Sequence, residues 1–182
     1  MLASGSPRRR GLLLEFGFDF EAVSSNADEG GVEGFAPADA VKELALRKAL
    51  WVKDRRAEDG SVILAADTLV YANGALLGKP VDEQDAFCML KSLSGTAHEV
   101  YTGIAILYGE KQITHAECTK VYFRPLEDSE IWAYIKTGEP MDKAGAYGIQ
   151  EKGGIFVSRI EGDYLNVLGL PLCKTYQLLR TL

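Results

Sequence analysis

The stretch SVILAADTLVY, Ser61 to Tyr71, decides the expected fold. Ser61 to Ala66 is predominantly apolar, which is typical of a buried strand, and the strand is expected to continue through Thr68 to Tyr71. Asn73-Gly74 follows directly and favours a hairpin turn. One carboxylate, Asp67, stands at the end of the apolar run. The stretch therefore predicts an interior strand that carries a polar group where its apolar part ends.

Helix and strand signals alternate on both sides of this stretch. Pro37 to about Arg56 has an apolar stripe that predicts a long helix, and Ser6 is placed to cap a shorter helix at Pro7 to Phe16. The other expected elements are a very short strand ending at residues 1–3, helices at 82–93, 128–136 and 171–182, strands at 99–108, 112–123 and 155–160, and a glycine-rich loop at 145–154. Without linker-like segments, this order predicts one α/β domain over residues 1–182, with helices around a mixed sheet.

Composition and charge exclude several classes of protein. The net charge of −6 argues against a broad nucleic-acid-binding surface, which needs a basic excess, although a local cationic cluster can still hold a phosphate. No apolar run reaches the roughly 18 residues of a membrane span, and no signal peptide is indicated. Cys88, Cys118 and Cys173 are far apart without a CxxC pair. Reduced thiols in a cytoplasmic protein are therefore expected.

The segment SGSPRR, Ser4 to Arg9, is a candidate anion-binding turn. The first N–H groups of a helix lack intrahelical partners and carry partial positive charge. Small residues such as Ser4 and Ser6 let a ligand approach, and Arg8 and Arg9 add fork-shaped donors suited to phosphate. An ordinary capped helix with surface arginines explains the same pattern equally well, so both interpretations stay open.

Two lysines are candidate phosphate ligands. Lys48 lies on the apolar stripe of its helix, four residues after Leu44. Lysine is rarely buried without a partner, so either its stem covers the stripe or its ammonium faces a negative ligand. Lys79 lies in the stiff turn Gly78-Lys79-Pro80, which lacks the spacing and the Ser/Thr of a P-loop. Taken alone, Lys79 is more simply a solvated loop lysine.

Two acidic residues are candidate metal ligands. Asp67 is also a candidate general base, because an unpaired buried carboxylate is costly and strand ends in α/β sheets are where ligands bind. A strand-end cap is the structural alternative. Glu29 lies in a polar loop and is typical of a solvated acid, yet paired with Asp67 it would suit Mg²⁺, which prefers one or two carboxylates plus water and phosphate oxygens. His98 and His115 show no ligand spacing, and structural or surface roles are expected for them.

These cations, the helix N-terminus and the acidic residues together form the set that phosphate-ester or anhydride chemistry requires. At the same residues the sequence resembles the Maf family of nucleotide pyrophosphatases nearly from end to end. The motifs that carry this resemblance are LASGSPRR (2–9), AADT (65–68), GKP (78–80), LSG (93–95) with His98, YTG (101–103), EPMDKAGAYGIQ (139–150) and GDYLNVLGLPL (162–172).

The resemblance implies an inosine-triphosphatase-like fold, which is α/β with a mixed sheet and flanking helices in two lobes around a central cleft. It further implies a homodimer that hydrolyses a nucleoside triphosphate between the α- and β-phosphates with Mg²⁺ or Mn²⁺. Asp67 would be the general base, Glu29 would help Asp67 to hold the metal, and the triphosphate would be bound by Ser4, Ser6, Arg8, Arg9, Lys48 and Lys79. Two features depart from the family pattern: the first strand is cut to Met1-Leu2, and Arg47 adds a charge whose role the sequence does not assign.

The substrate class is expected from three positions. In the family, Gln at the end of AGAYGIQ marks a subgroup acting on dTTP and UTP, together with an arginine of the first motif and the threonine after the aspartate. Here these are Gln150, Arg9 or Arg8, and Thr68. An amide both donates and accepts, so it can pair with a neutral pyrimidine. A purine-directed pyrophosphatase for ITP or XTP and a nucleotide-responsive binding protein that restrains cell division are the alternatives.

Overall fold

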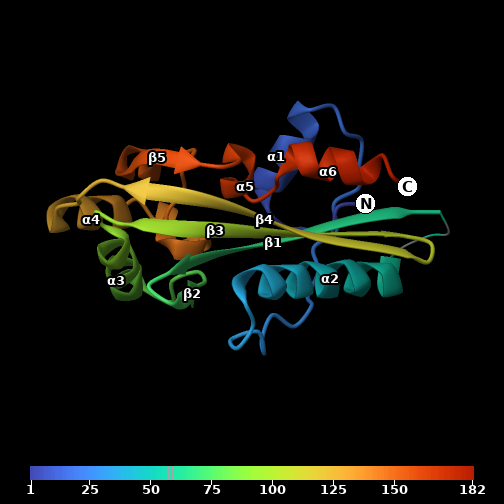
Figure 1. The fold of residues 1–182 in the computed structure, drawn as a ribbon, viewed down its shortest axis with the longest axis horizontal. Helices are drawn as coiled ribbons and strands as arrows, with labels where there is room; N and C mark the ends of the chain where they lie inside the picture. The colour runs from blue at the N-terminus through green and yellow to red at the C-terminus, as the bar shows by residue number, and fades with distance from the viewer. Residues whose placement is uncertain (57, 59) are drawn as a thin grey trace. The chain divides into compact units, whose positions relative to one another are not determined.

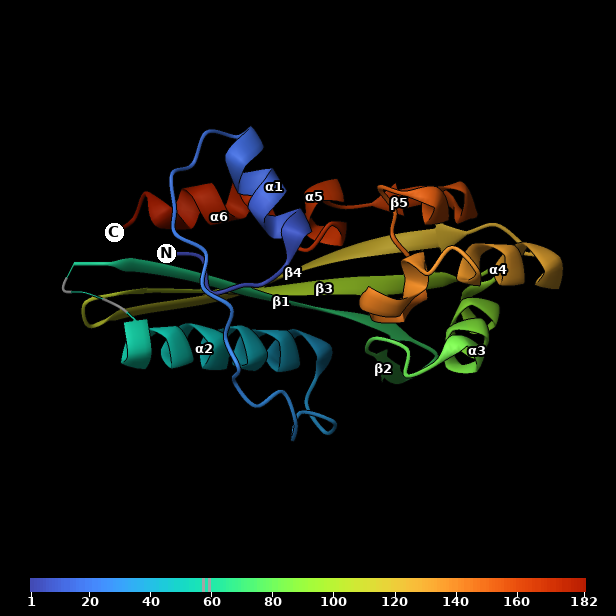
Figure 2. The same ribbon diagram turned by 180° about the vertical axis from the view of Figure 1, so that it is seen from behind.

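The computed structural model describes residues 1–56, 58 and 60–182 and is drawn in Figures 1 and 2. The chain forms two compact units. The first unit comprises Met1–Thr68, Thr102–Glu117 and Gly169–Leu182, and the second unit comprises Leu69–Tyr101 and Cys118–Leu168. The expected single domain over residues 1–182 and the cleft between two lobes stay predictions.

One five-stranded sheet has the order β2-β1-β3-β4-β5. The pairs β1–β2 and β4–β5 are antiparallel, whereas Leu2 makes isolated parallel bridges to Leu64 and Ala22, so the strand contacts are mixed as expected. Asn73 and Gly74 both have positive φ values, 51° and 81°, which form the predicted hairpin turn. The strands are β1 (Val62–Ala72), β2 (Ala75–Leu77), β3 (Ala97–Tyr108), β4 (Lys111–Phe123) and β5 (Val157–Glu161).

In the first unit, helices cover both faces of the strands. α2 (Pro37–Arg56) lies along one face, and α1 (Pro7–Glu15) and α6 (Leu172–Leu179) lie on the other (Figure 1). A Cβ atom on Gly103 would lie 2.1 Å from the carbonyl oxygen of Val41, so the backbone of α2 packs directly on β3. The predicted apolar stripe of α2 is buried, which places the residues along it against the sheet.

The second unit contains α3 (Glu83–Leu93), α4 (Asp128–Ile135), the short α5 (Tyr164–Val167) and the 3-10 turns η1 (Glu139–Asp142), η2 (Ala144–Ala146) and η3 (Lys152–Phe156). Its core includes an aromatic cluster in which the His98 Nε2 atom lies 2.8 Å from the Tyr147 hydroxyl oxygen. Burial lowers the pKa of His98 from 6.5 to about 4. The expected structural role of His98 is confirmed.

The predicted elements differ from the structure mainly at their ends and at short elements such as β2 and η1. The loop expected at residues 145–154 contains 3-10 turns. The strand expected from residue 155 begins at Val157, because η3 precedes it. The last helix ends at Leu179, and α5, capped by the Asp163 carboxylate, was not predicted. Single turns present too few residues for a periodic pattern. No described helix is long and apolar enough to cross a membrane.

Candidate active site

Lys48, Asp67 and Glu29 meet in the first unit. The Lys48 ammonium on α2 forms ion pairs with the Asp67 carboxylate on β1 and with Glu29 Oε1 at 2.8 Å. The side chains of Lys48 and Asp67 are 14% and 11% exposed, and that of Glu29 is 63% exposed. The Lys48 ammonium therefore lies against two carboxylates of the protein, and its expected contact with a negative ligand stays a prediction.

The charges of this cluster explain how Asp67 is kept inside. Burying a lone carboxylate is costly, and a paired ammonium offsets that cost when the geometry is good. With two carboxylates and one ammonium, the three side chains carry a formal charge of −1, because −1 −1 +1 = −1. Lys48 alone therefore does not neutralise both carboxylates, and Arg9 also interacts with them electrostatically.

A second group of polar contacts surrounds the guanidinium of Arg9, also in the first unit. Arg9 donates from Nε to the Gly169 carbonyl at 2.7 Å, from Nη2 to Thr68 Oγ1 at 3.0 Å and from Nη1 to Ser4 Oγ at 3.3 Å. Burial lowers the pKa of Arg9, whereas the negative charges of Asp67 and Glu29 act in the opposite direction. The two groups therefore share one electrostatic environment.

The turn before α1 is bridged by hydrogen bonds of serine side chains. Ser6 Oγ accepts a bond from the Arg9 backbone N–H at 3.4 Å, which confirms Ser6 as N-cap, and Ser4 Oγ accepts from the Ser6 N–H at 3.2 Å. A Cβ atom on Gly5 would lie 2.8 Å from Ser24 Oγ, so the two segments approach each other closely there. Arg8 lies on the first turn of α1 and is partly exposed. Phosphate binding at this turn stays a prediction.

Lys79 and Gln150 belong to the second unit, and both are exposed. Their segments meet there: the Gly145 N–H donates to the Gly78 carbonyl at 3.0 Å. A Cβ atom on Gly145 would lie 2.9 Å from Val70, so this contact depends on glycine. The expected action of Lys79 and Gln150 on the same nucleotide as the first unit stays a prediction.

The residues present fit a divalent cation. Asp67 and Glu29 converge on a single positive group, the Lys48 ammonium, and both supply the oxygen atoms that Mg²⁺ prefers. In the part of the chain that the structure describes, no group of three or more His, Cys, Asp or Glu side chains is arranged to hold a metal. Waters and substrate phosphate oxygens would therefore complete the coordination, as Mg²⁺ commonly requires.

Two contributors were not identified as site residues. Thr102, fully buried on β3, lies with its Oγ1 atom 2.9 Å from Thr68 Oγ1, and Gly169 supplies the carbonyl that fixes Arg9. Gly169 has φ +103°, and a Cβ atom there would lie 3.3 Å from Thr68 Oγ1. Gly103 in YTG and Gly169 in LGL are the sequence features that could indicate these contacts, because glycine within an element often marks a close backbone approach.

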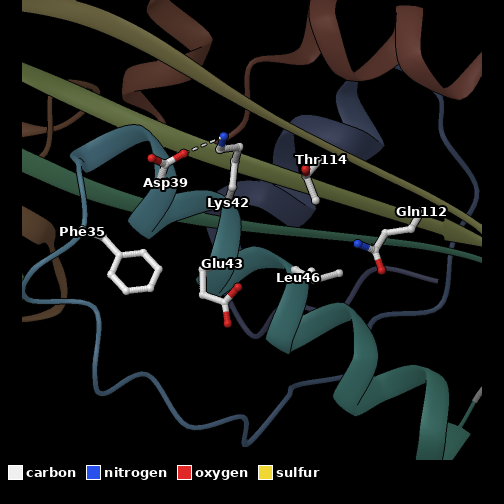
Figure 3. A pocket seen from close by; sticks show the side chains of 7 residues that line it. All are labelled: Phe35, Asp39, Lys42, Glu43, Leu46, Gln112 and Thr114. Carbon is white, nitrogen blue, oxygen red and sulfur yellow. Dashed lines mark ion pairs between the residues drawn. The ribbon is translucent and has the colours of Figure 1, made fainter.

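A separate pocket of about 230 Å³ lies in the first unit (Figure 3). None of the predicted site residues lines it. Its lining consists of Phe35, Asp39, Lys42, Glu43, Leu46, Gln112 and Thr114.

The fold is α/β, and its first unit contains a capped helix turn that carries arginines and a lysine that pairs with two carboxylates. Together these features define a candidate phosphate-processing protein. The chain matches the family described as "Maf-like protein" over residues 1–182, and it belongs to the Maf family. It is similar to the dTTP/UTP pyrophosphatase of Clostridium perfringens (strain SM101), with 49% identity over 98% of this chain and 94% of the relative. Those of Thermococcus gammatolerans and Bdellovibrio bacteriovorus are 52% and 48% identical, over 94% of this chain and 90% and 92% of the relatives.

Proposed function

We propose that this chain is a nucleoside triphosphate pyrophosphatase that hydrolyses dTTP, UTP and related modified pyrimidine nucleotides to the monophosphate and pyrophosphate. The observation that carries the proposal is the buried Asp67 carboxylate, held beside Lys48 and Glu29. The similarity to relatives named dTTP/UTP pyrophosphatase supports the choice of substrate.

Asp67 acts as the general base. Its carboxylate orients a water molecule and takes its proton as the water attacks the α-phosphorus, and pyrophosphate leaves. Lys48 fixes the Asp67 carboxylate by their ion pair. A proton acceptor on a buried strand is held rigidly, which favours a productive geometry for attack.

Asp67 and Glu29 would hold Mg²⁺ or Mn²⁺. When bound, the metal supplies Lewis-acid stabilisation of charge on the phosphoryl oxygens. Both carboxylates supply the oxygen ligands that such an ion prefers.

The triphosphate is bound by positive groups. The N–H groups of the Ser4–Arg9 turn and the side chains of Ser6, Arg8, Lys48 and Lys79 face its oxygens. Arg9 is better suited to base selection than Arg8, because its guanidinium is bonded to Thr68 and Ser4. Gln150 completes the selection by pairing with the pyrimidine edge.

The proposal includes a cytoplasmic homodimer that removes surplus or non-standard nucleotides. Sedimentation or light scattering of the purified chain tests the dimer, and a monomer at working concentration would contradict it.

The deciding experiment measures pyrophosphate release from a panel of canonical and modified nucleotides, with Mg²⁺ and then Mn²⁺, for the wild type and Asp67→Asn. We expect release from dTTP and UTP, and a loss of about 10²–10⁴-fold on substitution, which is the usual contribution of a general base. Asp128→Asn is the matched control, because Asp128 also pairs with a lysine, Lys91 at 2.5 Å, on an exposed surface.

Each other outcome changes a specific part of the proposal. Near-normal turnover of Asp67→Asn would remove Asp67 as base. Activity on ITP or XTP alone would keep the chemistry and replace the substrate. Tight nucleotide binding without release would favour the binding protein that restrains cell division.

A further inference from the structure

Glu29 lies on a stretch, residues 23–30, that forms neither helix nor strand. Residues 16–36 connect α1 to α2 and pass from one face of the first unit's strands to the other (Figure 2). Gly30 and Gly31 follow Glu29 directly, and glycine adds conformational freedom to a chain. A carboxylate on such a segment needs an external contact to stay beside Asp67.

Arg47 supplies that contact through the backbone. Its Nη1 atom donates to the Gly30 carbonyl at 2.7 Å and to the Asp28 carbonyl at 3.4 Å, so both residues that flank Glu29 are bonded to one guanidinium. The segment is tightened locally, since the Gly30 N–H donates to Asp28 Oδ1 at 2.9 Å.

Arg47 is itself held in place. Its Nε atom donates to Glu43 Oε1 at 2.8 Å, one turn earlier on α2. Lys48, the next residue along the helix, contacts the carboxylate of Glu29. Consecutive residues of α2 thus bind the backbone and the side chain of the same segment.

An ion pair with Glu43 alone would make Arg47 an ordinary surface residue of a helix. The bonds to two carbonyl groups distinguish Arg47 from that case, because a planar fork of donors suits several acceptors at fixed angles.

We propose that Arg47 is a positioning residue for metal binding, which holds residues 28–30 so that the Glu29 carboxylate stays beside Lys48 and Asp67. The inference rests on the proposed function, since it assigns Arg47 a role toward the same metal. Arg47 acts through Glu29 and does not touch the reacting atoms.

The test measures Mn²⁺ binding to the full chain by calorimetry, without nucleotide. Residues that orient metal ligands typically contribute 10–100-fold to metal affinity, so Arg47→Ala is expected to weaken Mn²⁺ binding by about that factor. Arg47→Lys keeps the charge but lacks the fork, and we expect a similar loss. Glu43→Gln should give a smaller loss in the same direction.

Lys42→Ala is the matched control. It removes a 2.8 Å ion pair between Lys42 and Asp39, which both belong to α2 (Figure 3), and Mn²⁺ affinity should not change. Unfolding midpoints without metal show whether each variant is folded. If Arg47→Ala is not folded, the Mn²⁺ affinity of Arg47→Lys provides the test instead.

A second set of variants in the Glu29→Gln background separates positioning from direct action. If Arg47 acts through Glu29, Arg47→Ala should add little further loss there. Equal losses in both backgrounds, or undiminished Mn²⁺ binding by Arg47→Ala alone, would overturn the proposal for Arg47. A folded wild type that neither binds Mn²⁺ nor releases pyrophosphate would overturn the proposed metal-dependent function, and the role of Arg47 with it.

Discussion

Lys48 compensates the charge of Asp67, whose side chain is only 11% exposed, and removing Lys48 takes that ammonium away. Lys48→Met is therefore expected to lower the free energy of unfolding by about 2 kcal/mol, within the usual cost of an unsatisfied buried polar group. Urea denaturation at pH 7 measures the effect. The double variant with Asp67→Asn should recover part of the loss, whereas strictly additive losses would show that the two charges are not coupled.

His98 gives the protein a defined acid dependence. Its pKa falls from 6.5 to about 4 because burial disfavours the charged ring. Below pH 6.5 the unfolded chain takes up a proton that the folded chain does not. Neutral His98 therefore contributes fully to the free energy of unfolding above pH 6.5. This contribution, up to about 3 kcal/mol, is lost as the pH falls toward 4.

Unfolding free energies of the wild type and His98→Gln, compared at pH 7 and pH 4.5, test this dependence. The variant should lose less stability between the two values, since glutamine does not titrate. Equal losses in the two proteins would contradict it.

The contacts of these residues differ in how well sequence predicts them. The stripe of α2 predicts the place of Lys48, and apolar neighbours predict that Asp67 is buried. The bond from Arg9 to Gly169 joins residues separated by 160 positions, so no local pattern indicates it. The contacts of Arg47 to residues 28–30 are similar, because they are made to backbone carbonyls, which every residue possesses.

At the scale of elements, the approach of α2 to β3 depends on a single glycine. A methyl group on Gly103 would lie 2.1 Å from the Val41 carbonyl oxygen, and backbone atoms cannot move aside like a flexible side chain. Gly103→Ala should therefore displace α2 and destabilise the protein by about 3 kcal/mol, the upper range for overpacking. Denaturant unfolding measures the loss.

Gly11→Ala is the matched control for this substitution. Gly11 lies within α1, and a Cβ atom there meets nothing within 4 Å. Its replacement should stabilise the helix by about 0.5–1 kcal/mol. A Gly103→Ala protein as stable as the wild type would show that α2 tolerates the displacement.

Elements with explicit start signals could be predicted closely. Ser6 caps α1 as expected, the helix expected from residue 82 begins directly after its cap Asp82, and α2 has its predicted bounds. η2, η3 and α5 are three to five residues long, so packing and caps determine them rather than periodicity.

At the scale of the molecule, substrate choice tests whether both units act on one nucleotide. Gln150 belongs to the second unit and Arg9 and Thr68 to the first. Gln150→Glu should lower kcat/KM for dTTP and UTP by at least about 10-fold, because a carboxylate cannot donate to the base and leaves a polar group unpaired. Steady-state assays across the nucleotide panel measure the change.

Gln84→Glu makes the same substitution on α3 of the second unit and should leave kcat/KM unchanged. A uniform loss for every nucleotide in Gln150→Glu would indicate a general effect on the protein rather than base selection.

The family and the fold class could be predicted from the sequence because several motifs occur in order along the chain. The expected action of Lys79 and Gln150 on the same nucleotide as the Asp67 cluster stays a prediction, because these residues belong to different units.

The three cysteines are exposed, and the units divide them: Cys173 belongs to the first unit, and Cys88 and Cys118 belong to the second. With Cys118 replaced by serine, a donor and an acceptor dye can be attached to native side chains, one on each unit. Energy transfer between the dyes then reports the separation of the two units in solution. Adding dTTP with metal would reveal whether a nucleotide draws them together.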